Sequence, residues 1–236
     1  MKKSIIVPVY NEQGNIGNLI SKINLVIDKT DELIIVDDGS TDKTSEEIKN
    51  HKCILISLDK NMGKGYAMRK GIQEAKGEYI IFMGGDGQDD PYEIKLLLEE
   101  ITKGYDYVIG SRFLKENKKD DRFSEKAVLP VNEFGNKSIT FLINILFNKN
   151  ITDSQSEFKC FKTEKLRELN LVTKRFEIET ELLIKSFRKK FKIKEVPVHR
   201  YERKHGISKL FNVPFGRFLF GLKVLRTIII GYLFWR

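Results

Sequence analysis

The chain has 236 residues, of which 41% are hydrophobic and 32% charged, so its length suits one large domain or two small ones. Two cysteines, Cys53 and Cys160, exclude a disulfide framework, and three scattered histidines exclude a zinc site with regular ligand spacing. The net charge of +9 is uneven, with 14 Lys and Arg against 19 Asp and Glu in residues 1–110 and 28 against 14 in residues 111–236.

The first half of the chain alternates short apolar runs with helical patterns. Five runs are predicted strands, at residues 4–9, 33–38, 53–58, 79–83 and 107–111. The first of them is too short for the apolar region of a signal peptide, so we expect none. Strands that alternate with helices predict an α/β fold, a mainly parallel sheet flanked by helices on both faces. Ligands of such sheets bind beyond the carboxyl ends of the strands.

The second half is less regular. Residues 115–126 are highly charged and predict a mobile surface loop. Apolar spacing predicts amphipathic helices around residues 139–147 and 181–187, and a strand follows near residues 193–200.

The C-terminal segment, residues 210–236, is apolar with interspersed basic residues. Its longest uncharged run, residues 227–235, is far shorter than the ~20 residues that cross a bilayer. Trp235, Tyr232 and the basic residues favour a helix in the membrane interface. The alternative is a helix that docks on the core or on a second subunit, which would make the chain a homo-oligomer.

Two motifs with carboxylates or glycines allow both a functional and a structural interpretation. Asp37 and Asp38 end a strand before a Gly-Ser-Thr-Asp cluster, which is typical either of a turn and helix cap or of carboxylates that bind a base or a ribose. The glycines around Lys64 lack the spacing of a phosphate loop or a dinucleotide fingerprint, so a plain turn is at least as good an interpretation.

The run GGDGQDDP, residues 84–91, crowds carboxylates at a strand end. Asp86 and Gln88 are two residues apart, so in extended backbone they project the same way and would offer oxygen ligands to Mg²⁺ or Mn²⁺. Asp89, Asp90 and Pro91 instead indicate the start of the next helix.

The basic half supplies candidate anion ligands. Arg112 directly follows a predicted strand, and Arg203 and Lys209 flank a glycine in a loop that would curl around one phosphate. A solvated basic loop is the alternative for either residue taken singly. A nucleic-acid partner would explain the net charge, but the strand-end carboxylates would repel its phosphates, so we expect none.

Nine segments in order resemble the family 2 glycosyltransferases, and within them the branch of dolichol-phosphate mannose synthase and bacterial polyprenyl-phosphate sugar transferases. The resemblance covers nearly the whole chain and rests on IIVPVYNE (5–12), IIVDDGSTDKT (34–44), N-x-GKG-x-A (61–67), MGGDGQDDP (83–91), IGSRF (109–113), TDSQSEFKCFK (152–162), IETELL (178–183), EVPV (195–198) and RKHGISK (203–209).

The resemblance implies a GT-A domain over residues 1–209, a UDP- or GDP-linked sugar donor, a polyprenyl (dolichyl or undecaprenyl) phosphate acceptor and a divalent Mg²⁺ or Mn²⁺. It implies peripheral attachment to the cytoplasmic face of a membrane. The residues that it assigns to the nucleotide sugar are Pro8, Tyr10, Glu12, Asp37, Asp38, Gly85, Asp86 and Gln88. Those that it assigns to the metal are Asp86 and Gln88, and those that it assigns to phosphate are Arg112, Arg203 and Lys209, with Asp86 and Arg112 as the catalytic pair.

The chain departs from the family pattern at two positions. Gly84 stands where the family usually has the first aspartate of Asp-x-Asp, and Glu157 stands where it usually has glycine. Because Mg²⁺ keeps several waters and takes ligands from a diphosphate, one aspartate and one glutamine suffice in principle.

The expected reaction needs no general base, because a lipid phosphate is already an anion at neutral pH. Its demands are positioning and charge stabilisation, and attack from the opposite face inverts the anomeric centre. Two alternatives stay open: transfer to a glycan or protein hydroxyl, which needs a carboxylate base, and a non-catalytic nucleotide-sugar binder that has lost its metal.

Overall fold

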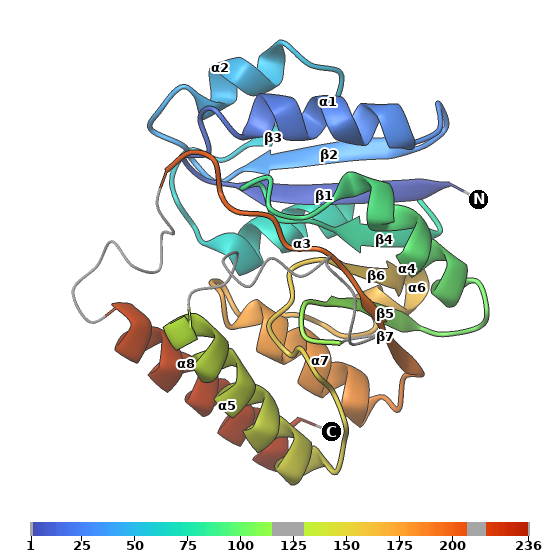
Figure 1. Cartoon of the computed structure of the whole chain (residues 1–236), viewed down its shortest axis with the longest axis vertical. Helices are drawn as coiled ribbons and strands as arrows, with labels where there is room; N and C mark the ends of the chain where they lie inside the picture. The colour runs from blue at the N-terminus through green and yellow to red at the C-terminus, as the bar shows by residue number, and fades with distance from the viewer. Residues whose placement is uncertain (1, 115–129, 207–215, 236) are drawn as a thin grey trace.

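The computed structural model describes residues 2–114, 130–206 and 216–235, and a seven-stranded sheet runs through it (Figure 1). The strands lie in the order β3-β2-β1-β4-β6-β5-β7. Their bounds are β1 Lys3–Val9, β2 Glu32–Asp37, β3 Ile54–Ser57, β4 Tyr79–Phe82, β5 Tyr107–Ser111, β6 Lys159–Lys162 and β7 Ile193–Pro197. Every pairing is parallel except those of β6, which runs antiparallel to β4 and β5. The predicted mainly parallel α/β sheet is confirmed.

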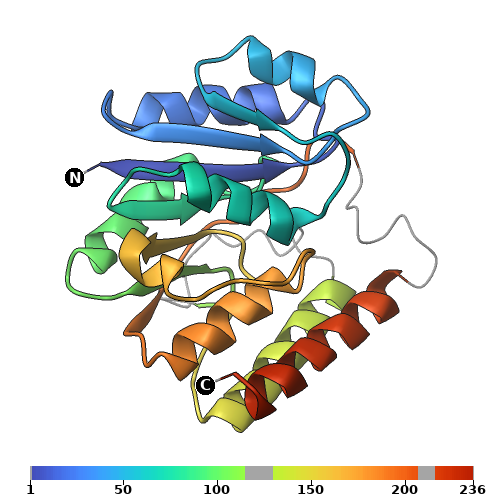
Figure 2. The same ribbon diagram turned by 180° about the vertical axis from the view of Figure 1, so that it is seen from behind.

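Helices cover both faces of the sheet. One face packs against α1 (Ile16–Val26), α2 (Thr44–Lys49) and α4 (Ile94–Ile101), which follows the short 3-10 turn η1 (Pro91–Glu93). The helices of the other face are α3 (Lys64–Glu74), α5 (Pro130–Phe147), α6 (Thr163–Arg167), α7 (Ile178–Arg188) and α8 (Gly216–Leu233). Seen from behind, α3, α7 and α8 come to the front (Figure 2).

Alternation along each strand supplies the two cores. In β1, Ile6 packs with α3 on one face, whereas Ile5 and Val7 pack with α1 on the other. Successive side chains of a strand point to opposite faces of the sheet. Because helices cover both faces here, every position of such a strand can be apolar, rather than every second one.

The last helix, α8, lies beside α5 and α7 (Figure 1, red and olive). Val224 and Ile228 of α8 are fully buried in the core, while Leu222, Leu225 and Ile229 stay 41–48% exposed. In the described parts of the chain, no helix combines the length and the apolar character that spanning a bilayer requires. The charged run at residues 115–126 and the expected domain boundary at residue 209 lie outside the described residues.

Gly39, in the turn after β2, has a φ of +72°, and a Cβ there would lie 2.5 Å from the carbonyl carbon of Lys60. We expect Gly39→Ala to lower the free energy of unfolding by about 1–3 kcal/mol, because the backbone must adopt a strained conformation or shift. Urea denaturation measures this. Gly104→Ala is the matched control, since Gly104 also has a positive φ but no atom within 4 Å of the added carbon. Equal losses in both variants would contradict the clash.

Candidate active site

Six segments meet at the edge of the sheet where the parallel strands end. Five of them follow β1, β2, β4, β5 and β7, and the sixth precedes β6 because that strand is reversed. They are residues 10–12, 37–40, 83–90, 111–113, 153–158 and 198–206. All the predicted site residues within the described parts of the chain lie on these segments, except Pro8, which lies within β1.

The segment after β1 presents Glu12, which is 7% exposed. Its Oε1 accepts a hydrogen bond from Arg203 Nη2 at 2.6 Å, and its Oε2 accepts one from Asn15 Nδ2 at 3.0 Å. Burial raises the pKa of the Glu12 carboxyl, although Arg203 opposes that rise. Pro8 and Tyr10, which precede Glu12, are half-buried.

The two aspartates after β2 differ in how they are bound. Both oxygens of Asp38 accept backbone N–H groups, from Met62 at 2.7 Å and from Gly63 at 2.8 Å. Asp37 Oδ1 accepts the N–H of Ser40 at 2.9 Å. Asp38 therefore joins two loops, whereas Asp37 ties only the turn that follows β2.

The loop after β4 directs three oxygen-bearing side chains at one arginine. Arg200 Nη1 donates to Asp89 Oδ1 at 2.7 Å, and Arg200 Nη2 donates to Gln88 Oε1 at 3.0 Å and to Asp86 Oδ2 at 3.3 Å. Asp86 and Gln88 thus lie together and face the same positive charge. The second oxygen of Asp89 accepts the N–H of Gly84 at 3.0 Å.

The charges of Arg200 and of the carboxylates around it oppose the effect of burial on their pKa values. Burial raises the pKa of Asp89, and the Arg200 guanidinium lowers it in part. Burial would lower the pKa of Arg200, but Asp86, Asp89 and Glu157 raise it well above its ordinary value. The guanidinium is therefore fixed as a cation among these oxygens.

The predicted helix start holds for Asp90 and is wrong for Asp89. Asp90 Oδ1 accepts the N–H of Tyr92 at 3.0 Å, so it caps η1, and Pro91 begins that turn. Asp89 is 4% exposed and turns toward Gly84 and Arg200 instead. Its carboxylate belongs to the site rather than to the cap.

Residues 199–206, which we call the crossing segment, run from β7 across the strand ends toward α1 (Figure 1, orange to red). The N–H of Tyr201 donates to Gln88 O at 2.8 Å, and His205 exchanges two hydrogen bonds with Asn15. Arg203, held by Glu12, also lies 3.7 Å from Asp86. The segment therefore brings two guanidinium groups onto the carboxylates.

Arg112, after β5, forms a two-pronged pair with Asp153. Its Nε and Nη2 donate to Asp153 Oδ2 and Oδ1 at 2.7 Å and 2.8 Å, and the Asp153 side chain is fully buried. Although burial opposes ionisation, Arg112 lowers the pKa of the Asp153 carboxyl. Arg200 and Glu157 lie within electrostatic range of Arg112, so the pair borders the same site.

Lys64, at the start of α3, is buried between two carboxylates. Its Nζ lies 2.9 Å from Glu157 Oε1 and 2.6 Å from Glu179 Oε1. Glu179 also pairs with the buried Lys159 of β6. Lys64 thus has a charge-pairing role, and the glycines beside it allow the chain to approach Lys174 closely.

The structure brings Glu12, Asp86, Gln88 and Arg203 together. Gly85 adjoins them, and a Cβ there would lie 2.5 Å from Val9 Cγ1. Lys209 lies outside the described residues.

Sequence reasoning missed three site residues: Asp89, Glu157 and Arg200. In the sequence, Asp89 has the spacing of a helix cap, and Glu157 stands out only as a departure from a family pattern. Arg200 stands in a strand-like run where no local signal separates it from a surface arginine.

The donor set suits a hard divalent cation. Asp86, Asp89 and Glu157 offer carboxylate oxygens and Gln88 offers an amide oxygen, and oxygen ligands are those that Mg²⁺ and Mn²⁺ prefer. Within residues 2–114, 130–206 and 216–235, no three His, Cys, Asp or Glu side chains are arranged to hold a metal by themselves. A cation here would therefore need oxygens from its ligand as well, as Mg²⁺ commonly does.

Comparison with known proteins decides the family. A family model described as glycosyl transferase family 2 matches residues 4–169, more than half of the chain. The chain is a family 2 glycosyltransferase.

Several relatives of this glycosyltransferase carry named activities. The dolichol-phosphate mannosyltransferase of Pyrococcus furiosus is 31% identical over 220 residues, 89% of this chain and 59% of that protein. The undecaprenyl-phosphate 4-deoxy-4-formamido-L-arabinose transferase of Edwardsiella ictaluri is 27% identical over 215 residues, 87% of this chain and 62% of that protein. The chain spans less than two thirds of the length of both. An uncharacterized protein of Methanocaldococcus jannaschii is 31% identical and matches 98% of this chain and 92% of its own length.

Solved structures place this glycosyltransferase in the GT-A fold. Glucosyl-3-phosphoglycerate synthase from Mycobacterium tuberculosis, in complex with Mn²⁺, uridine diphosphate and phosphoglyceric acid, superposes with a TM-score of 0.74 at 20% identity. The match covers 98% of this chain and 78% of that one. At this identity the likeness establishes the fold alone.

Proposed function

We propose that this glycosyltransferase moves a sugar from a UDP- or GDP-linked donor to a polyprenyl phosphate at a membrane surface, with inversion of the anomeric centre. Residues 1–209 form its catalytic domain. The observation that carries the proposal is the meeting of Asp86 and Gln88 with Arg200 and Arg203 at the strand ends, in a chain whose named relatives use dolichol or undecaprenyl phosphate.

The donor side of the site is built from the ends of β1, β2 and β4. Asp37 and Glu12 offer carboxylate oxygens to the nucleoside, beside Pro8, Tyr10 and Asp38. Gly85 lets the loop after β4 pack closely against Val9 of β1, which keeps Asp86 beside the proposed diphosphate position. Asp86 and Gln88 would hold Mg²⁺ or Mn²⁺, which supplies positive charge to the departing nucleoside diphosphate.

The acceptor side is basic. Arg203, Arg112 and Lys209 hold phosphate groups in this proposal, and Arg200, which shares Asp86 with Arg203, adds a further cation. A phosphate needs no base to become a nucleophile, so these residues orient it and offset its repulsion from the donor. When ligands bind, Arg200 and Arg203 exchange carboxylate partners for phosphate oxygens, which guanidinium groups bind equally well.

The experiment that tests the proposal incubates the full chain with UDP- and GDP-sugars, with and without polyprenyl phosphate, in Mn²⁺ or Mg²⁺. We expect a glycolipid product, detected by mass spectrometry, only when polyprenyl phosphate and a divalent cation are both present. Transfer to phosphoglyceric acid, glycans or protein hydroxyls with equal efficiency would overturn the lipid acceptor. Donor binding without any turnover would favour a non-catalytic binder.

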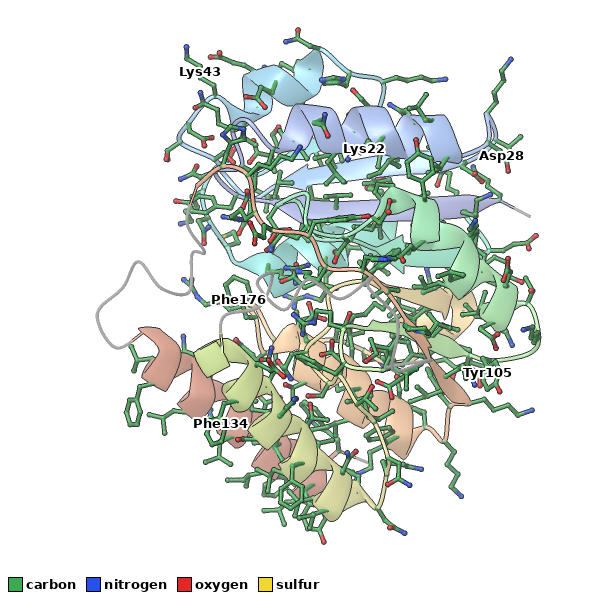
Figure 3. All side chains as sticks on the ribbon, viewed as in Figure 1. Lys22, Asp28, Lys43, Tyr105, Phe134 and Phe176 are labelled. Atoms are coloured by element: carbon green, nitrogen blue, oxygen red, sulfur yellow. The ribbon has the colours of Figure 1, made fainter. Side chains whose placement is uncertain are left out.

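We propose further that residues 210–236 contact the membrane through α8. Leu222, Leu225 and Ile229 form one exposed apolar stripe, and Lys223 and Arg226 lie exposed beside it. Phe134 of the neighbouring α5 also projects outward, 76% exposed (Figure 3). Apolar side chains bordered by basic ones suit an anionic bilayer surface.

Replacing Leu222, Leu225 and Ile229 by serine should reduce binding to vesicles of anionic phospholipid by roughly 10-fold or more, because each loses buried apolar area in the interface. Co-sedimentation measures the bound fraction. Deleting α8 is a poorer test, since Val224 and Ile228 belong to the core. The control changes to serine Leu25 of α1 and Val172 of the segment between α6 and α7, which are 75% and 61% exposed away from α8. Unchanged sedimentation of the triple variant would refute membrane contact by this stripe.

A further inference from the structure

Gly84 and Glu157 lie opposite each other although they are far apart in the sequence. β4 pairs antiparallel with β6, in a register that sets Phe82 against Lys159. Continued by two residues, this register sets Gly84 against Glu157. The residues just before β6 therefore face the residues just after β4, as cross-strand neighbours do.

The Glu157 carboxylate occupies the space that a side chain at position 84 would fill. A Cβ built on Gly84 would lie 2.6 Å from Glu157 Oε2, too close for both to be present without a shift. The same point lies 3.2 Å from Asp86 Oδ1 and 3.4 Å from Asp89 Oδ2. Three carboxylates thus surround one vacant side-chain position.

Glu157 is held in this position rather than free in solvent. Its Oε1 lies 2.9 Å from the buried ammonium of Lys64, which Glu179 fixes from the other side. This leaves Oε2 directed at Gly84. Although burial opposes ionisation, Lys64 and Arg200 lower the pKa of Glu157 to about 2, so the group is a carboxylate at neutral pH.

We propose that Glu157 supplies to the cation site the carboxylate that Gly84 does not carry, reaching across from β6 to act beside Asp86. The proposal rests on the function above, in which Asp86 and Gln88 hold a divalent cation next to the donor diphosphate. A side chain at position 84 is then unfavourable while Glu157 keeps its place against Lys64, because an aspartate there and a glutamate at 157 compete for one space.

A purely structural role for Glu157 predicts something different. As a partner of Lys64 alone, it would affect stability but not cation affinity, and Glu179 would still neutralise Lys64 after its loss. Cation binding, measured apart from both stability and turnover, separates the two roles.

The test measures Mn²⁺ binding to the full chain by electron paramagnetic resonance, with Mn²⁺ alone and with Mn²⁺ plus UDP or GDP. The variants are Glu157→Gln, Glu157→Gly, Gly84→Asp and the transposed double variant Gly84→Asp/Glu157→Gly. Asp90→Asn is the control, because it removes a nearby carboxylate that caps η1. Thermal melting reports the fold of each variant.

We expect both single changes at Glu157 to weaken Mn²⁺ binding by about 10-fold or more, and Asp90→Asn to leave it unchanged. Gly84→Asp alone should lower the melting temperature through crowding. The double variant should regain Mn²⁺ affinity to within about 3-fold of the wild type, since the carboxylate returns from the other strand.

Wild-type affinity in Glu157→Gln would overturn the proposal, as would a folded double variant no better than Glu157→Gly. If the glycine variants fail to fold, Glu157→Gln decides alone, because it keeps the size of the side chain and removes only the charge. A wild-type chain that binds no Mn²⁺ would also overturn it. Failure of the proposed function shows separately, as absent glycolipid formation by a wild-type chain that binds Mn²⁺ normally.

Discussion

Asp86→Asn should reduce sugar transfer by roughly 100- to 1,000-fold, the cost typical of removing one preorganised electrostatic contact in an active site. Asp86 accepts from Arg200 and lies near Arg203, so its carboxylate stands where cation and donor diphosphate meet in the proposed reaction. Initial rates at saturating Mn²⁺ and donor measure the loss. The fold should persist, because Arg200 keeps its shorter contact with Asp89.

Asp90→Asn is the matched control for this prediction as well. Asparagine caps a helix as well as aspartate does, so η1 should remain and turnover should stay near the wild-type value. A rate for Asp86→Asn within a few-fold of wild type would remove Asp86 from the cation site.

Arg112→Ala should lower the free energy of unfolding by about 3–5 kcal/mol, because it leaves the carboxylate of Asp153 buried without its charge partner. The wild-type pair is two-pronged, with the Asp153 side chain fully buried and Arg112 11% exposed. Urea denaturation at neutral pH measures the loss. Lys103→Ala is the control, since its pairing with Glu100 is exposed to solvent and should matter little.

The same pair predicts a pH dependence. The pKa of Asp153 is lowered in the folded chain. Its ionisation therefore contributes fully to the free energy of unfolding above the pKa of the unfolded chain, about 3.9, and this contribution is lost as the pH falls through the pKa of the folded chain. In Arg112→Ala, burial without a partner raises the pKa of Asp153, so acid protonates the group and relieves its cost. The stability difference between the two proteins should therefore shrink toward pH 4. A constant difference would show that the loss comes from packing instead.

The order of strands and helices could be predicted because each parallel strand is an apolar run bounded by turns. The predicted strands at residues 4–9 and 107–111 agree with β1 and β5 to within a residue. The C-terminal helix was also predicted, and of its two proposed environments the one that docks it on the core is confirmed, while contact with a membrane stays a prediction. Val224 meets the core, whereas Leu222 on the same helix remains exposed.

The strand β6 could not be predicted from its own sequence. Its four residues, KCFK, include the buried Lys159, and lysine is a residue type that is almost never fully buried unless it is paired. Its partner is Glu179 of α7, a residue distant in the sequence. The strand thus depends on a tertiary ion pair that no local pattern reveals.

The site was predictable where spacing along one segment sufficed, as for Asp86 and Gln88. It was not where two segments had to meet. Glu157 reaches Gly84 only through the register of β4 and β6, and Arg200 reaches Asp89 only because the crossing segment runs back over the strand ends.

The reversed direction of β6 has a mechanical consequence. This strand is only four residues long. Its hydrogen bonds to β4 and β5 nevertheless fix the position, along the sheet, of the residues that precede it, and these include Asp153 and Glu157. A slip of one residue turns every side chain to the opposite face. Deleting Phe158, which lies between both acidic residues and β6, would therefore misalign the two groups at once, whereas a short insertion after α6 would spare both.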